Sequence, residues 1–159
     1  MVLLSRRVIF GLGAVPLLPV SAGAQDCDAR TDTRILASPF DFDTLLNRVE
    51  KSVEDNGMTL VAQVSASRGA AGRGVKIPGN AIVMVFRNDF AVRMLEASVA
   101  AGIEAPLRLY LIENANGTAT LSYRPPTTVF GPYRVPALDD LARELDPIFE
   151  RIATQAVGP

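Results

Sequence analysis

Two short segments with alternating apolar residues, joined by an Asn-Gly dipeptide, constrain the fold of this chain most strongly. Leucine recurs at every second position from 107 to 111, and Ala119, Leu121 and Tyr123 repeat the alternation. A period of two is typical of a strand that buries one face. Because Asn116-Gly117 is the dipeptide that a type I′ turn prefers, residues 107–123 are predicted to form a β-hairpin. Pro125-Pro126 should end it, since neither proline can donate to a neighbouring strand.

Three further segments are predicted to be strands. Residues 33–37 form a short candidate, and residues 59–65 alternate Leu60, Ala62 and Val64 with their neighbours. Residues 81–86 read AIVMVF, which is apolar at both parities. Such a run is typical of a strand in the middle of a sheet, and we expect both of its faces to be covered.

Three segments show the spacing of helices. The first begins after Asp41, a good N-terminal cap, and ends at Asn56-Gly57. The second runs from Phe90 and closes near Gly102, and the third covers residues 138–156. Pro147 interrupts the third, so Asp146-Pro147 predicts either two short helices, the second capped by Asp146, or one bent helix.

The remaining segments are predicted to be loops. Residues 68–74 are rich in glycine but lack the Gly-Lys-Ser/Thr ending of a phosphate-binding loop, so we expect a mobile connector there. A second loop should run from the paired prolines to Pro136. The predicted order is β-α-β-β-(α)-β-β-α, which is an α+β domain with a largely antiparallel sheet and helices on one face. We expect a single domain over residues 33–158, preceded by a disordered segment at 25–32.

The first 24 residues have the anatomy of a signal peptide. Arg6 and Arg7 precede an apolar stretch, and small residues follow at positions 22–24. We predict cleavage between Ala24 and Gln25. The apolar stretch has thirteen residues, whereas about 20 are needed to cross a bilayer, so no stable membrane insertion is expected after cleavage.

Export predicts a periplasmic or secreted bacterial protein. Residues 5–10 resemble the twin-arginine export motif, and the general secretory route is the alternative. Removal of residues 1–24 takes away two arginines and no acidic residue, so the formal charge changes from −1 to −3. A mildly acidic domain has no basic excess to neutralise phosphates, and no nucleic-acid partner is expected.

The composition excludes several kinds of chemistry. Histidine is absent, which removes Ser-His-Asp and Cys-His nucleophiles and every histidine-ligated metal site. Cys27 is the single cysteine, so it is either a free thiol or a link to a second copy. Since the chain also shows no cofactor motif, we expect neither a cofactor nor a metal.

Several short motifs in this order resemble the family called domain of unknown function 302. A helix ends in Asn56-Gly57, and a glycine- and alanine-rich connector comes after the second strand. Residues 86–89 (FRND) stand where the family tends to show Phe-Gly-Asn-Pro. Residues 102–107 (GIEAPL) stand where it tends to show Gly-Leu-Asp-Leu-Pro-Leu, and Tyr123 with Pro126 matches its strand-ending tyrosine and proline. The resemblance implies an α+β fold similar in strand order to TATA-box-binding-protein-like (TBP-like) domains, and a homodimer. It implies no agreed biochemical activity.

The first functional interpretation is a non-catalytic domain that binds an unidentified small ligand or serves in assembly. Arg87, Asn88 and Asp89 directly follow a buried strand, so a rigid scaffold should hold them. Arg108 and Tyr123 are further candidates on the hairpin. The alternatives are that Asn88 and Asp89 only form a turn and a helix cap, and that Tyr123 belongs to the core.

The second interpretation is a hydrolase-type enzyme that uses carboxylates without histidine or metal. Asp89, Glu104 and Glu113 are its acid-base candidates, because each lies near a predicted strand end. Glu104 is singled out again because nothing in the apolar pattern of residues 99–113 requires it. No spacing selects a pair of carboxylates, so we favour the non-catalytic interpretation.

Overall fold

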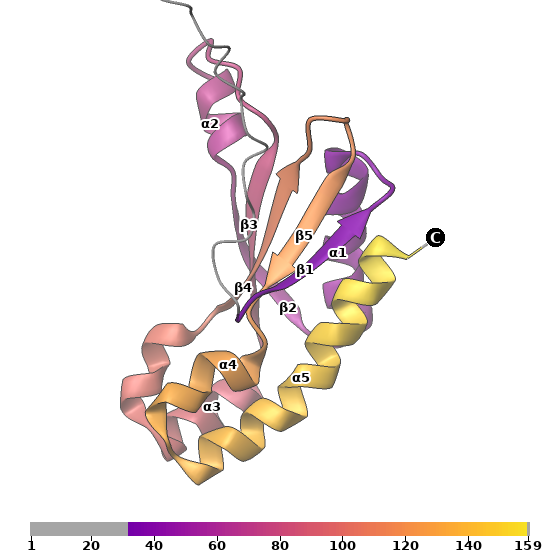
Figure 1. Ribbon diagram of the computed structural model, residues 1–159. Coiled ribbons are helices and arrows are strands. Elements are labelled where there is room, and N and C mark those ends of the chain that lie inside the picture. Colours follow the sequence, from indigo (N-terminus) through magenta and orange to yellow (C-terminus); the bar gives the residue numbers. More distant parts are fainter. Residues whose placement is uncertain (1–31, 159) are drawn as a thin grey trace, which may run out of the picture.

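Five strands form one antiparallel sheet in a computed structural model that describes residues 32–158 (Figure 1). From edge to edge, the strands are β1 (Arg34–Ser38), β5 (Ala119–Tyr123), β4 (Leu107–Glu113), β3 (Asn80–Phe86) and β2 (Thr59–Val64). Every neighbouring pair is antiparallel. The predicted α+β class is therefore confirmed.

Two long helices cover one face of this sheet. Helices α1 (Phe42–Asp55) and α5 (Pro136–Val157) pack against each other and on the strands, which lie in front of α1 in Figure 1. The core holds the alternate strand residues Val83, Leu109 and Leu121, all fully buried. No helix within residues 32–158 lies on the other face, where Ile82, Met84 and Phe86 of β3 are partly buried. Coverage of residues 81–86 on both sides therefore stays a prediction.

Polar side chains fix the ends of the long helices. The Asp41 carboxylate accepts a hydrogen bond from the Thr44 backbone N–H at 2.8 Å, which confirms the predicted cap. Gly57 ends the segment with φ +69°. The Arg48 guanidinium donates to the carbonyl oxygens of Ala156 at 2.7 Å and Gly158 at 2.5 Å, so α1 caps the carboxyl end of α5.

Helix α5 is a single helix with Pro147 inside it. Asp146 does not cap a second helix, as one alternative had it. Its carboxylate accepts hydrogen bonds from the Thr127 backbone N–H at 3.0 Å and the Thr127 hydroxyl at 2.7 Å. These bonds hold the start of α4 (Pro126–Phe130), which is continued by the 3-10 turn η2 (Gly131–Tyr133). A helical segment thus replaces most of the predicted loop.

The hairpin between β4 and β5 is confirmed, but its turn differs from the expected type I′. Only Gly117 takes a positive φ, +82°, whereas type I′ needs positive φ at both central residues. The Gly117 N–H donates to the Asn114 carbonyl, and the Asn114 N–H donates to the Thr118 carbonyl. The loop is therefore one residue longer than a two-residue turn, with glycine at its left-handed position.

The sheet ends in two projections of different character. Residues 65–79, here called the arm, extend from β2 and β3 at one end and contain the short helix α2 (Ala66–Ala71), which replaces the expected connector. At the opposite end lie α3 (Asn88–Ala97), the 3-10 segment η1 (Val99–Glu104), α4 and the first half of α5. We call residues 87–104 and 124–146 the end lobe. None of the helices within residues 32–158 has the length and apolar composition needed to cross a bilayer.

Candidate binding surface and its polar hollow

The sheet face opposite α1 and α5 is here called the open face. Strand register places on it the residues that alternate with the core positions. Across the sheet these residues are Ile35, Ala37, Thr120, Ser122, Arg108, Tyr110, Ile112, Asn80, Ile82, Met84, Phe86, Thr59, Ala62 and Val64. Arg108 is the single charged residue among them.

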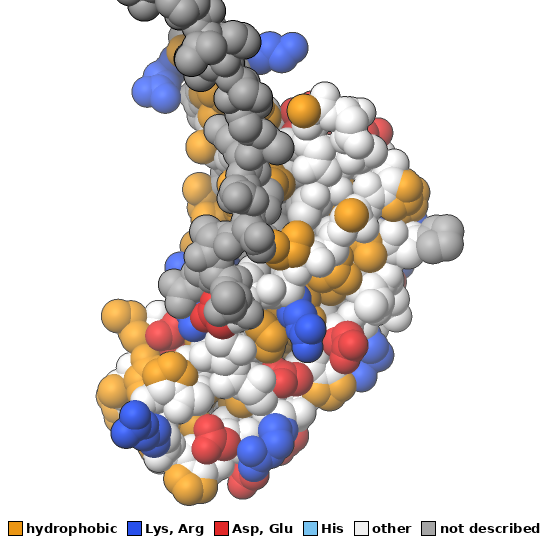
Figure 2. All heavy atoms as spheres, viewed as in Figure 1, with side chains coloured by type: hydrophobic (Ala, Val, Ile, Leu, Met, Phe, Trp, Pro, Cys, Tyr) orange, Lys and Arg blue, Asp and Glu red, His pale blue; other side chains and the backbone are white. Residues whose placement is uncertain are grey.

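This composition is unusual for a face that meets water. Antiparallel sheets with one solvated face normally alternate apolar inward and polar outward residues. Here Ile35, Tyr110 and Val64 are 43%, 43% and 54% exposed, and they come from both edges and the centre of the sheet. In Figure 2, orange side chains are visible over the strands beside the grey atoms, and orange, red and blue side chains are mixed over the end lobe. The open face is therefore more apolar than the solvated face of an antiparallel sheet normally is.

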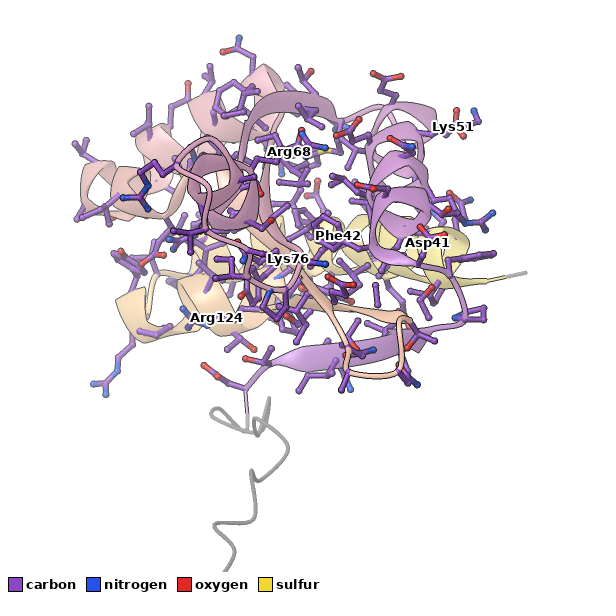
Figure 3. All side chains as sticks on the ribbon, turned by 90° about the horizontal axis from the view of Figure 1, so that it is seen from above. Asp41, Phe42, Lys51, Arg68, Lys76 and Arg124 are labelled. Atoms are coloured by element: carbon purple, nitrogen blue, oxygen red, sulfur yellow. The ribbon has the colours of Figure 1, made fainter. Side chains whose placement is uncertain are left out.

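The arm carries positive charge and exposed apolar side chains. It contains Arg68, Arg73 and Lys76 and no acidic residue, and Val75 and Ile77 on it are 50% and 40% exposed. Figure 3, which looks down onto the arm, shows Arg68 and Lys76 upon it. The Ser65 hydroxyl caps α2 by accepting from the Arg68 N–H at 3.1 Å.

The base of the arm is held tightly. The Gly79 N–H donates to the Glu113 carboxylate, and the Glu113 N–H donates to the Gly79 carbonyl, both at 2.7 Å. Glu113, one of the acid-base candidates, thus has a structural partner. A Cβ added to Gly79 would lie 2.7 Å from Cγ of Phe42, so only glycine allows the start of α1 to approach here.

A polar hollow lies where β4 and β5 meet the end lobe. Its lining residues are Glu104, Leu107, Arg108, Arg124 and Val129, and its volume is about 50 Å³. The Tyr133 hydroxyl donates to Glu104 Oε1 at 3.2 Å. Burial and this hydrogen bond raise the pKa of Tyr133. The structure therefore brings together two of the predicted site residues, Glu104 and Arg108.

The Arg87 group lies elsewhere, at the start of α3. Arg87 Nε donates to Asp89 Oδ1 at 2.7 Å, and its guanidinium lies 4.1 Å from the centre of the Phe90 ring. The hydrogen bond from Arg87 lowers the pKa of Asp89. Asn88 is exposed and is the first residue of the helix. The polar atoms of Arg87 and Asp89 thus satisfy each other, as in a structural turn.

Tyr123 lies on the covered side of the sheet, away from Arg108. It is 7% exposed, and its ring centre is 6.0 Å from that of Phe149 in α5. Burial raises the pKa of its hydroxyl. The alternative interpretation of Tyr123 as a core residue therefore describes its position.

The carboxylates proposed for an enzyme do not share a site. Asp89 pairs with Arg87, Glu104 lies in the hollow, and Glu113 is at the other end of β4 beside Gly79. Across residues 32–158, no three Asp, Glu or Cys side chains gather where they could hold a metal ion. The predicted cleavage site, Ala24 and Gln25, and Cys27 lie outside the described residues.

An apolar cavity of about 30 Å³ lies between β3 and the helices of the end lobe. Phe90, Met94 and Phe130 are among its lining residues. A water-sized group needs roughly 10–15 Å³ on this measure, so the cavity is too small for an organic ligand. It is a small apolar recess at the edge of the core, partly open to solvent.

Sequence reasoning missed Arg124, the second basic residue of the hollow. Arg124 follows the last residue of β5 directly, and Arg108 lies in the neighbouring strand near the end where that strand begins. Because antiparallel partners bring opposite strand ends together, this register could have paired the two arginines in advance.

The comparison with curated proteins gives no match. Among solved structures, the chain is similar to an uncharacterized conserved DUF302 protein from Bacillus stearothermophilus, with a TM-score of 0.71 and 20% identity. The alignment covers 80% of this chain and 99% of that one, which shows a shared fold. The model of the family DUF302, domain of unknown function, matches residues 35–155, and the chain belongs to that family.

Proposed function

We propose that this chain is an exported, non-catalytic domain that assembles with a second copy of itself through the open face of its sheet. The observation that carries the proposal is the apolar character of that face, where Arg108 is the only charged strand residue. Pairing with a second copy would remove these side chains from water, as the helices do on the other face.

The area of the open face is large enough to form most of an interface with another protein chain. Five strands about 4.8 Å apart, each five to seven residues long, give a face of roughly 400–550 Å². A standard interface buries about 800 Å² on each partner. The arm, with Val75 and Ile77 exposed, offers the additional area.

Pairing through the sheet edges is the less favourable way to assemble. Edge strand β2 has an irregularity between Leu60 and Ala62, which interrupts the row of backbone groups that another strand would need. The other edge, β1, has only five residues. Face-to-face packing therefore makes better use of the exposed surface.

Charge selects one of two symmetric arrangements. A two-fold axis along the strands would bring the two arms together, each with three basic residues and no acidic one. An axis across the strands would instead bring each arm toward the end lobe of the other copy. That lobe has five basic and seven acidic residues, so the second arrangement joins opposite charges.

Sedimentation velocity of residues 25–159, which contain every described element, tests this assembly. We expect a dimer at a protein concentration of about 100 µM, because this concentration exceeds a dissociation constant in the micromolar range. Tyr110→Glu, at the centre of the open face, should give monomers, because a dimer would then have to bury the charge of the new carboxylate. Val92→Glu is the matched control, because Val92 on α3 has similar exposure but lies off this face. Monomeric protein both with Cys27 intact and with Cys27→Ser would contradict the proposal.

The export part of the proposal rests on the signal-like first 24 residues. Intact mass of the full chain, recovered from the periplasm of a bacterial host, should begin at Gln25. Replacing Arg6 and Arg7 with lysine should block export only if the twin-arginine route is used. Retention of the uncleaved chain in the cytoplasm would contradict export without affecting the assembly proposal.

A further inference from the structure

We propose that the polar hollow binds a carboxylate group of a small acidic ligand, and that Asp32 competes for it from within the same chain. The hollow is built by one chain, from η1, the start of β4 and the residue after β5. This inference goes beyond the assembly proposal, with which it shares one residue, Arg108 of the open face.

Arg124 gives the first reason. Its Nε atom is buried and forms no hydrogen bond with the residues that the structure describes. The Asp32 carboxylate oxygen lies 3.2 Å from this nitrogen, close enough for an ion pair but off the direction of the N–H. A buried N–H without a hydrogen bond is costly, so a better-placed acceptor would be stabilised at this position.

Arg108 gives the second reason. It lines the same hollow, and it forms no ion pair or hydrogen bond with any residue between 32 and 158. Arginine guanidinium groups match carboxylates in shape and can donate two parallel hydrogen bonds to them. Two arginines on one hollow, one without a partner and one imperfectly paired, favour an anion between them.

The volume of the hollow and the charges around it favour a single carboxylate group as the ligand. The hollow holds about 50 Å³, enough for roughly three to five water-sized groups at 10–15 Å³ each. Asp32 and Glu104 balance the two arginines, so the four side chains together are formally neutral. If a ligand carboxylate takes the place of Asp32 at Arg124, that balance is preserved.

Arginine side-chain NMR tests the site on residues 25–159. The Nε–H signal of Arg124 is followed during titration with sodium acetate, with chloride keeping the ionic strength constant. Asp32→Asn should bind acetate about ten-fold more tightly than the unchanged domain, because the internal competitor loses its charge. Within the Asp32→Asn background, Arg108→Gln should weaken acetate binding by roughly ten-fold or more. Arg143→Gln, an exposed residue of α5 outside the hollow, should leave the affinity unchanged.

Each outcome bears on the proposal. If acetate does not shift the Arg124 signal in Asp32→Asn, the hollow is not a carboxylate site. Equal effects of Arg108→Gln and Arg143→Gln would show general screening by the anion and would also overturn it. If inorganic phosphate saturates the same signal as tightly as acetate does, the assignment to carboxylates is wrong.

Discussion

The two faces of the sheet are made by the same strands but differ in what covers them within residues 32–158. On the covered face, Val83, Leu109 and Leu121 are fully buried beneath α1 and α5. On the open face, Ile82 and Met84 alternate with such residues, yet no described helix covers them. The comparison teaches that an apolar strand residue need not belong to the core of its own chain. We propose that Ile82 and Met84 belong to an interface with a second copy.

The largest expected effect is a difference in the free energy of unfolding that is lost when a residue of each face is replaced. Leu109→Ala should lower the free energy of unfolding by about 2–5 kcal/mol, because it leaves a cavity in the covered core. Ile82→Ala on the open face should cost about 1 kcal/mol in the dilute monomer, since less of that side chain leaves water. Urea unfolding at low protein concentration measures both, and equal losses would contradict the distinction between the faces.

The next effect tests how the covered side is joined to the arm. Gly79→Ala should destabilise the domain by about 1–3 kcal/mol, because the new methyl group would overlap the Phe42 ring. Gly69→Ala within α2 is the matched control, since nothing lies within 4 Å of a Cβ there. It should be neutral or slightly stabilising. Phe42→Leu should partly rescue Gly79→Ala, and a lack of rescue would place the strain elsewhere.

The smallest effect concerns charge in the end lobe. Arg93 donates to both Glu144 oxygens, at 2.8 and 2.6 Å, and these hydrogen bonds lower the pKa of Glu144. A carboxyl group with a lowered pKa stabilises the fold above its unfolded pKa of about 4. That stabilisation is lost as the pH falls through the folded value. Glu144→Gln should therefore flatten the fall of stability below about pH 4. An unchanged slope would mean that solvent screens this exposed pair.

The sequence predicted the elements whose signals are local and long enough to show a period. Asp41 and Asn56-Gly57 bound α1 as expected, and the alternation of Leu107, Leu109 and Leu111 faces the core. Helices α2 and α4 have six and five residues. Such lengths are too short for a 3.6-residue period to appear, and α4 depends on hydrogen bonds from Asp146 that no local pattern reveals.

The open face and the hollow were hidden for different reasons. Residues 81–86 are apolar on both faces of the strand, which predicts that both faces are covered. This pattern does not tell whether the second face is covered by the same chain or by another one. In the hollow, Asp32 meets Arg124 only because β1 pairs with β5. Contacts between segments so far apart in the sequence follow from topology, which propensity and periodicity do not determine.

Cross-linking at the centre of the open face tests the central claim most directly. Tyr110 lies in the middle of β4, the central strand, so a two-fold axis in either arrangement should bring it close to its own copy. In a Cys27→Ser background, Tyr110→Cys should form covalent dimers rapidly with a thiol cross-linker that spans the approximately 10 Å between packed sheets. Val92→Cys should form few. Equal, slow cross-linking at both positions would show that the open face does not pair, and would contradict the account.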